Sequence, residues 1–425
     1  MNDGLALNLA EQTDTAEGPE CGSRSSADWW SRPDLGWQDQ TLKFAGRTVP
    51  DLARQFGTPS FFYSTARLEN NVQRLYEALA GAGFGGRCRV NYAMKANRFA
   101  PLLTFLKQTG LVGIDACSPN EVEHAIGCGF DSTEICFTNT SLSRQDLDRL
   151  ARIDGLRINC DSLHTIKQWG QRRPGSRIGI RINPACGVSR AQNEKLQYAG
   201  PTTTKFGIYR EQFREALALA DRHDLTVDTI HFHTGCGYLN GQLDIWNGIL
   251  NECRWFIDQV PALRFVNIGG GLGVPHVESD EPLDLERWSS MLRSHFGDRP
   301  ELTIELEPGD YVAKDAGILV LTVGSVEKKR DTVFVGVNGG FNIAVEPVVY
   351  CLPFQPVPAI RRSGPQQRYT IAGHINEALD VWYRDIDLPS LAEDDVLVLL
   401  NAGAYSSSMA SNHCMRGEYR EFLLF

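Results

Sequence analysis

The chain has 425 residues, more than a single hydrophobic core usually serves, so we expect two packed units. Hydrophobic residues make up 42% and charged residues 22% of the sequence, which excludes a disordered, collagen-like or coiled-coil chain. The formal net charge of −10 gives no electrostatic drive toward nucleic acid or a membrane surface and favours a small-molecule partner.

Residues 1–30 are expected to be a disordered tail. They carry acidic residues from Asp3 to Glu20 instead of a basic stretch followed by an apolar one, so they do not resemble a secretory signal. No run approaches the roughly 20 apolar residues that a membrane-spanning helix requires. The eleven cysteines form no C-x-x-C pair, which argues against a disulfide framework and a zinc site. We therefore expect reduced thiols, a cytoplasmic location and no metal.

Residues 56–314 are predicted to form a (β/α)8 barrel. Short apolar runs alternate there with amphipathic segments, which is typical of strand-helix units around a parallel sheet. The eight predicted strands are Val90–Met94, Val112–Ala116, Glu134–Phe137, Arg157–Cys160, Arg177–Ile182, Val227–His233, Arg264–Ile268 and Leu302–Glu307. The predicted helices include Pro119–Gly127, Gln212–Ala220, Leu285–His295 and one on which Leu68, Val72, Leu75 and Leu79 share a face.

Residues 315–425 are predicted to form a second, mainly antiparallel β domain, a barrel or a sandwich, because strands there follow one another without a clear crossover helix. Residues 31–55, with an extended stretch near 41–49, are expected to join this domain. The segment 183–210 is long for a connection between a strand and a helix, so we expect a mobile active-site loop. The predicted strands are Ile318–Val323, Thr332–Val337, Arg368–Ala372, Val396–Leu400 and Tyr419–Leu424.

In a barrel of this kind, chemistry takes place at the carboxyl ends of the strands. Polar residues stand at or after the predicted strand ends, and they are Lys95, Asp115, Arg181, His231, His233, Gly269–Gly271 and Glu307. An amine for an imine bond, glycine N–H groups for a phosphate and a carboxylate opposite a ring nitrogen suit pyridoxal phosphate. A lone lysine is usually a solvated surface group. The apolar flanks of Lys95 instead predict desolvation, which would lower the pKa of its ammonium group.

Five ordered motifs carry a resemblance to a known family. They are VNYAMKAN around Lys95, HFHTGCG at 231–237, NIGGGLG at 267–273, ELEPG at 305–309 and LNAGAYSSSMASN at 400–412. From about Phe56 to the end, the chain resembles the alanine-racemase-type fold, in its group of diaminopimelate and ornithine decarboxylases.

The resemblance implies roles for individual residues. Lys95 would bind pyridoxal phosphate covalently, His233 would stack on its ring and Glu307 would face its pyridine nitrogen. The other implied cofactor-binding residues are Asp115, Arg181, Gly269–Gly271, Cys236 and Tyr405. The resemblance also implies a homodimer in which the loop 373–380 completes the site of the other subunit.

Some positions depart from the family pattern. Asn376 stands where the family has a cysteine that is thought to protonate the substrate, and an amide cannot replace that donor at neutral pH. His374, His413 and the freed Lys95 are candidate donors, and His374 is expected to be catalytic together with Asn376.

Two further positions exchange an expected arginine for an acid. Asp310 follows the EPG turn, and Glu346 stands where diaminopimelate enzymes bind the distal carboxylate of their substrate. Losing that arginine argues against diaminopimelate as the substrate. Glu346, Glu377 and Asp380 would suit a distal amine or guanidine, which predicts a decarboxylase of a basic or derivatised amino acid in specialised metabolism. A racemase or epimerase, and a non-catalytic protein that binds pyridoxal phosphate, are the alternatives.

Overall fold

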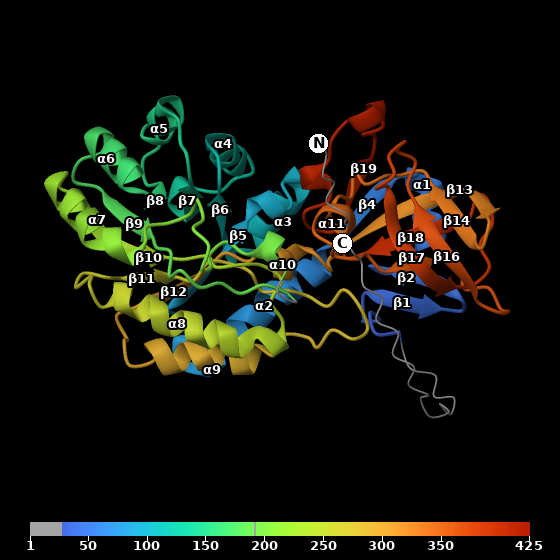
Figure 1. Ribbon diagram of the computed structural model, residues 1–425, viewed down its shortest axis with the longest axis horizontal. Helices are drawn as coiled ribbons and strands as arrows, with labels where there is room; N and C mark the ends of the chain where they lie inside the picture. The colour runs from blue at the N-terminus through green and yellow to red at the C-terminus, as the bar shows by residue number, and fades with distance from the viewer. Residues whose placement is uncertain (1–27, 191–192) are drawn as a thin grey trace, which may run out of the picture.

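The computed structural model of the chain describes residues 28–190 and 193–425, so nearly all of the predicted tail lies outside the described residues. Two units lie side by side (Figure 1), one built of alternating strands and helices and the other mainly of strands. No helix in the described ranges is both long and apolar enough to cross a membrane.

The first unit is a closed barrel of parallel strands, which confirms the predicted (β/α)8 architecture. The strand order around the barrel is β10-β11-β12-β5-β6-β7-β8-β9. The predicted strands coincide with these within about two residues at each end. The barrel strands are β5 (Cys88–Ala93), β6 (Val112–Ala116), β7 (Ile135–Asn139), β8 (Arg157–Cys160), β9 (Arg177–Arg181), β10 (Thr226–His231), β11 (Phe265–Asn267) and β12 (Thr303–Leu306).

Helices cover the outside of the barrel. The apolar positions predicted to share a face, from Leu68 to Leu79, are all buried on α2. Serine caps start several of these helices, and the Ser118 hydroxyl at the start of α4 accepts a hydrogen bond from the Glu121 N–H. The helices are α2 (Thr65–Leu79), α3 (Ala100–Thr109), α4 (Pro119–Gly127), α5 (Arg144–Leu150), α6 (Leu163–Arg172), α7 (Arg210–Arg222), α8 (Leu243–Ile257) and α9 (Leu285–Phe296).

The second unit is a mixed β-barrel that is nearly closed, rather than a purely antiparallel one. Strand β14 runs parallel to β16, and β19 runs parallel to β4, while the other pairs are antiparallel. Two short helices, α10 (Asp310–Ala313) and α11 (Glu346–Val349), lie close to this unit. Its strands are β4 (Ser60–Ser64), β13 (Gly317–Lys329), β14 (Thr332–Val337), β15 (Pro356–Pro358), β16 (Gln367–Ala372), β17 (Val381–Leu388), β18 (Val396–Leu400) and β19 (Arg420–Leu424).

The amino-terminal segment joins the second unit in two ways. Strands β1 (Leu35–Gln38), β2 (Thr41–Phe44) and β3 (Arg47–Thr48) form their own small sheet, and helix α1 (Val49–Phe56) follows. Their buried side chains pack against β13 and β18 instead of extending the main sheet. Strand β4 pairs with both β13 and β19, so residues 60–64 belong to the β unit, although the predicted domain boundary put them in the barrel.

Candidate active site

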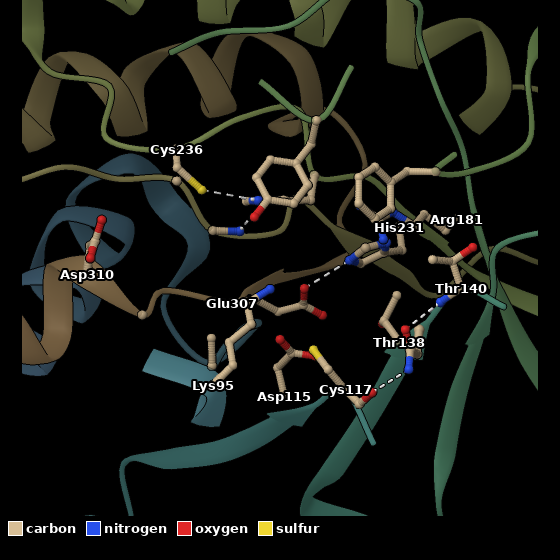
Figure 2. Close-up of a pocket in the computed structure, with 18 of the residues that line it drawn as sticks. Lys95, Asp115, Cys117, Thr138, Thr140, Arg181, His231, Cys236, Glu307 and Asp310 are labelled. Carbon is tan, nitrogen blue, oxygen red and sulfur yellow. Dashed lines mark hydrogen bonds and ion pairs between the residues drawn. The ribbon is translucent and has the colours of Figure 1, made fainter. Parts of the chain in front are cut away.

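A cavity of about 190 Å³ opens where the carboxyl ends of the barrel strands meet the β unit (Figure 2). Because parallel strands point their carboxyl ends the same way, residues distant in sequence converge there. The lining includes Lys95, Asp115, Cys117, Thr138, Thr140, Arg181, Tyr198, Phe206, His231, His233, Cys236, Gly270, Gly271, Glu307, Asp310 and Tyr405.

Lys95 stands in a 3-10 turn that follows directly on β5, and Figure 2 shows its side chain extending toward Glu307. Cys117 has the largest effect on the pKa of Lys95 and raises it. Burial has the next largest effect and lowers it, and Asp115 raises it again, so the pKa lies above its ordinary value. The predicted lowering of this pKa is therefore wrong in the protein without cofactor, because burial is outweighed by these neighbours from the adjacent strand.

Glu307 is held in place by two side chains. Its Oε2 lies 2.9 Å from His231 Nε2, and its Oε1 accepts a hydrogen bond of 2.7 Å from Asn267 Nδ2. Burial alone would raise the pKa of Glu307, but His231 and the hydrogen bonds outweigh it and hold the pKa below its ordinary value. Glu307 is therefore a fixed carboxylate in a buried setting, which can keep a proton on a basic nitrogen opposite it.

His233 and the glycine turn form one side of the cavity. The Gly270 N–H donates to His233 Nδ1 over 3.2 Å, and Cys236 Sγ lies 3.5 Å from His233 Nε2. Burial, with Lys95 next, lowers the pKa of His233 well below its ordinary value, so the ring is neutral. Burial also raises the pKa of Cys236 to about 12, so its side chain is a thiol.

The glycines of this turn are required by the space available. A Cβ on Gly270 would lie 2.2 Å from the carbonyl oxygen of Glu307. Gly269 and Gly271 have φ angles of 67° and 99°, which favour glycine. The backbone can therefore come close to a ligand at this point.

Asp115 and Arg181 are both buried and line the cavity. Burial first, and then the neighbouring Glu307, raise the pKa of Asp115. Its Oδ1 has no hydrogen-bond partner among the described residues. The Arg181 guanidinium lies 4.6 Å from the centre of the Phe206 ring.

Two aromatic residues that the sequence did not single out also line the cavity. Tyr198 and Phe206 come from the segment 183–210, and the Tyr198 ring centre lies 4.6 Å from that of His233. The same segment is tied to the β unit, because Asn193 Nδ2 donates to the Tyr350 carbonyl over 2.6 Å. No sequence pattern indicates which residues of a long loop turn inward. The predicted mobility of this loop stays a prediction.

The β unit contributes Tyr405, whose backbone N–H donates to the Ala96 carbonyl over 2.8 Å. This bond fixes the turn after β18 against the turn that carries Lys95. Cys117, which follows β6, also faces the cavity and was not predicted. Its signal was its position two residues after Asp115, at a strand end.

A charge cluster contains Asp310 and Glu346, the two acids at positions where the resemblance implies an arginine. The ammonium group of Lys314 donates to Glu346, and it lies 3.1 Å from Asp310 Oδ1. Lys314 is fully buried and was not predicted. Burial raises the pKa of Glu346 to about 8, although Lys314 opposes this. Glu346 is thus already paired within the chain and is not a free partner for a substrate amine.

The loop 373–380 does not line the cavity of its own chain. Asp380 is buried and accepts hydrogen bonds from the Phe341 and Ile375 N–H groups, so it shapes the loop. Asn376 is exposed, and Glu377 is an exposed side chain that lies 3.2 Å from His413 Nε2.

His374 has a defined tautomer in this loop. Arg416 donates to His374 Nδ1 over 3.1 Å, which leaves the ring proton on Nε2. Burial, with Arg416 next, lowers the pKa of His374, so the ring is neutral.

The residues present fit pyridoxal phosphate. An amine, a fixed carboxylate, a neutral imidazole and a close-approach glycine turn surround one cavity, and Asp115 Oδ1 is an unpartnered buried polar atom. Residues 65–314 match the family model for the pyridoxal binding domain of pyridoxal-dependent decarboxylases. The chain belongs to this family of pyridoxal-dependent decarboxylases. The predicted cofactor, pyridoxal phosphate, and the predicted class of enzyme, a decarboxylase, are thus confirmed.

Known relatives of the decarboxylase span almost the whole chain. It is 32% identical over 412 residues to the diaminopimelate decarboxylase of Methanothermobacter thermautotrophicus, covering 92% of each chain. The corresponding enzyme of Streptomyces coelicolor is 28% identical over 403 residues, covering 89% of this chain and 87% of the relative.

Solved structures show the same arrangement of the two units. A diaminopimelate decarboxylase variant from Helicobacter pylori complexed with L-lysine has a TM-score of 0.79 and 26% identity, covering 88% of this chain and 94% of that chain. The diaminopimelate decarboxylase of M. jannaschii has a TM-score of 0.83 at 23% identity, covering 92% of each chain, and supports the fold alone.

Proposed function

We propose that this decarboxylase removes the α-carboxylate from an amino acid other than diaminopimelate, and that a basic or derivatised amino acid is its substrate. The observation that carries this proposal is the buried cluster of Asp310, Lys314 and Glu346. Two positions at which the resemblance implies arginines hold acidic side chains that already contact Lys314. A second carboxylate on the substrate would therefore lack a guanidinium partner there.

The cofactor site is proposed as follows. Lys95 holds the cofactor aldehyde, the turn Gly269–Gly271 with Cys236 and Tyr405 surrounds its phosphate, and His233 lies against its ring. When bound, pyridoxal phosphate withdraws the electron pair that remains when the substrate loses its carboxylate. Glu307 keeps a proton on the ring nitrogen, and His231 and Asn267 hold Glu307 in the ionised form that this role needs.

Two chains together would complete each site. The loop 373–380, which is exposed at residues 376–379, lies outside the cavity of its own chain, which supports a homodimer in which it reaches the cavity of the other copy. Within the loop, His374 carries its ring proton on Nε2 and is the donor we favour in place of a cysteine. Glu377 is the exposed acid of this loop, beside His413, and is the one we propose to meet a distal amine or guanidine of the substrate.

The test of this function is a substrate panel. Carbon dioxide release and product mass are measured with meso-diaminopimelate, lysine, ornithine, arginine and acylated diamino acids. We expect turnover of a basic or acylated amino acid. Diaminopimelate as the best substrate would contradict the proposal. Glu377→Gln should lower kcat/KM for a basic substrate by about tenfold, since a charge-assisted hydrogen bond is lost. Glu393→Gln, at another exposed glutamate, serves as the matched control.

The dimer is tested separately. Light scattering gives the mass of the loaded enzyme. Mixing inactive Lys95→Ala chains with chains whose residues 374–379 are all glycine should restore about one quarter of the activity, because half of the dimers are mixed and each has one complete site. A monomeric active enzyme, or no restored activity from mixed dimers, would exclude the shared site.

The observation of a fixed carboxylate at Glu307 also bears on the racemase alternative. The resemblance implies an arginine near the pyridine nitrogen in racemases of this fold, so a carboxylate at Glu307 favours decarboxylation over racemisation. Optical rotation measured alongside carbon dioxide release separates the two reactions, and loss of optical activity without carbon dioxide would favour a racemase.

A further inference from the structure

Five arginines line one hollow of about 570 Å³ at the amino ends of the barrel strands, opposite the end that carries Lys95. They come from neighbouring strands and the loops before them. The lining arginines are Arg89, Arg157, Arg173, Arg177 and Arg264.

The acids beside this hollow balance only part of its positive charge. Arg157 donates to Glu305 over 2.6 Å, and Arg89 lies 3.7 Å from the same carboxylate. On the other side, Asp228 is shared, with Arg177 at 3.3 Å and Arg264 at 3.7 Å.

Four guanidinium groups therefore share the two buried carboxylates. The fifth, Arg173, pairs with the exposed Asp154. Among these groups, two positive charges are left without a counter-charge, in a chain whose formal net charge is −10.

Hydrogen-bond donors are also left over. A guanidinium group has five N–H donors. Among the described residues, Arg89 and Arg264 make only the contacts of 3.7 Å with acids, which are too long for hydrogen bonds. Both side chains are more than half exposed, so these donors can reach a ligand in the hollow.

An aromatic ring holds three of the guanidinium groups together. Phe265 is buried, and the central carbons of Arg89, Arg157 and Arg264 lie 4.8 to 5.1 Å from its ring centre. Such contacts attract a cation to a ring face and order its side chain. The donors are thus gathered before any ligand arrives, which reduces the entropy that binding costs.

We propose that this hollow binds a small multivalent oxyanion, one that carries at least two phosphate or carboxylate groups. Two unbalanced charges call for more than one anionic group, and forked guanidinium donors match the oxygens of both kinds. The overall negative charge of the chain disfavours a long nucleic acid at the same place. The site is independent of the proposed substrate because none of its residues lines the cavity around Lys95.

The test is calorimetric titration of the cofactor-loaded enzyme with inorganic pyrophosphate at fixed ionic strength. Loading keeps the cofactor phosphate site filled, and no substrate is needed, so the outcome does not depend on the proposed activity. We expect one saturable site per chain. A parallel titration with citrate distinguishes carboxylates from phosphates as the preferred source of the anion.

Two variants locate the binding. Arg264→Gln should weaken pyrophosphate binding by about tenfold or more, as expected when a charged donor is lost. Arg177 then still pairs with Asp228, so the fold is expected to hold, and a circular dichroism melt checks this. The control Arg368→Gln, which removes an exposed partner of Asp387 in the β unit, should leave binding unchanged.

Three results would overturn the proposal. They are no saturable binding of either anion, the same affinity in Arg264→Gln as in the parent enzyme, and tighter binding of a single-stranded oligonucleotide than of pyrophosphate at equal phosphate concentration.

Discussion

Replacing Lys314 by methionine should destabilise the protein strongly. The Lys314 ammonium group is fully buried and pairs with both Asp310 and Glu346. Methionine preserves most of the volume but leaves the carboxyl groups of Asp310 and Glu346 without their cation, and Glu346 is buried. Removing one partner of a buried ion pair costs about 3–5 kcal/mol of unfolding free energy. At roughly 2–4 °C per kcal/mol, the melting temperature should fall by about 6–20 °C.

The loss of stability should depend on pH in a defined direction. Burial holds the pKa of Glu346 at about 8 in the folded chain, against an ordinary value of about 4.3. A group with a raised folded pKa contributes stability that is complete below its unfolded pKa and is lost as pH rises through the folded pKa. Without Lys314, the pKa of Glu346 rises further, so above pH 8 the deficit should grow by up to about 1.4 kcal/mol per pH unit.

The assay is urea unfolding of the parent and variant enzymes at pH 7 and pH 9. Lys328→Met, which removes an exposed lysine of β13, is the matched control and should change the unfolding free energy by less than about 0.5 kcal/mol. Adding Glu346→Gln to Lys314→Met should prevent the deficit from growing above pH 8. A deficit below about 1 kcal/mol, equal at both pH values, would refute this reasoning.

Other changes test the remaining parts of the site. Glu307→Gln should lower kcat by about 10²–10³-fold with cofactor still bound, because an amide cannot stabilise the positive ring nitrogen. Glu301→Gln is the exposed control, and near-normal carbon dioxide release by Glu307→Gln would contradict this role. Gly270→Ala should lower the unfolding free energy by about 1–3 kcal/mol and weaken cofactor binding in equilibrium dialysis. Gly241→Ala, with open space around its Cβ, should bind the cofactor normally, and equal binding by both variants would contradict the crowding argument. Burial lowers the pKa of His233, so its contribution to stability is present above pH 6.5 and is lost as pH falls further. In urea unfolding, His233→Gln should reduce the pH dependence of the unfolding free energy in this range by up to about 1.4 kcal/mol per pH unit. An unchanged pH dependence would contradict this.

The convergence of the site residues could be predicted because it follows from local patterns. The alternating apolar runs predicted where the strands end, and parallel strands bring their carboxyl ends together. Lys95, Asp115 and Glu307 therefore lie around one cavity, as their positions predicted. The glycine turn was recognisable for the same reason, since it follows a strand.

Contacts between distant segments could not be read from the sequence. The i, i+4 spacing of Asp310 and Lys314 was visible, but the pairing with Glu346, 32 residues further on, depends on how α11 packs. The pKa of Lys95 was predicted from its apolar flanks alone, and the acids that raise it come from the next strand. Likewise, β4 pairs with a strand more than 350 residues away, which no local pattern records.

The central claim is tested most directly by the absorbance of purified protein supplied with pyridoxal phosphate. The parent enzyme should show the visible band of the lysine-bound cofactor, and borohydride followed by mass spectrometry should place the reduced cofactor on Lys95. Lys95→Ala should show no such band, while Lys107→Ala, which removes a lysine paired with Glu134 away from the cavity, should keep it. A parent enzyme that binds no cofactor, or a Lys95→Ala variant that retains the band and full activity, would contradict the account.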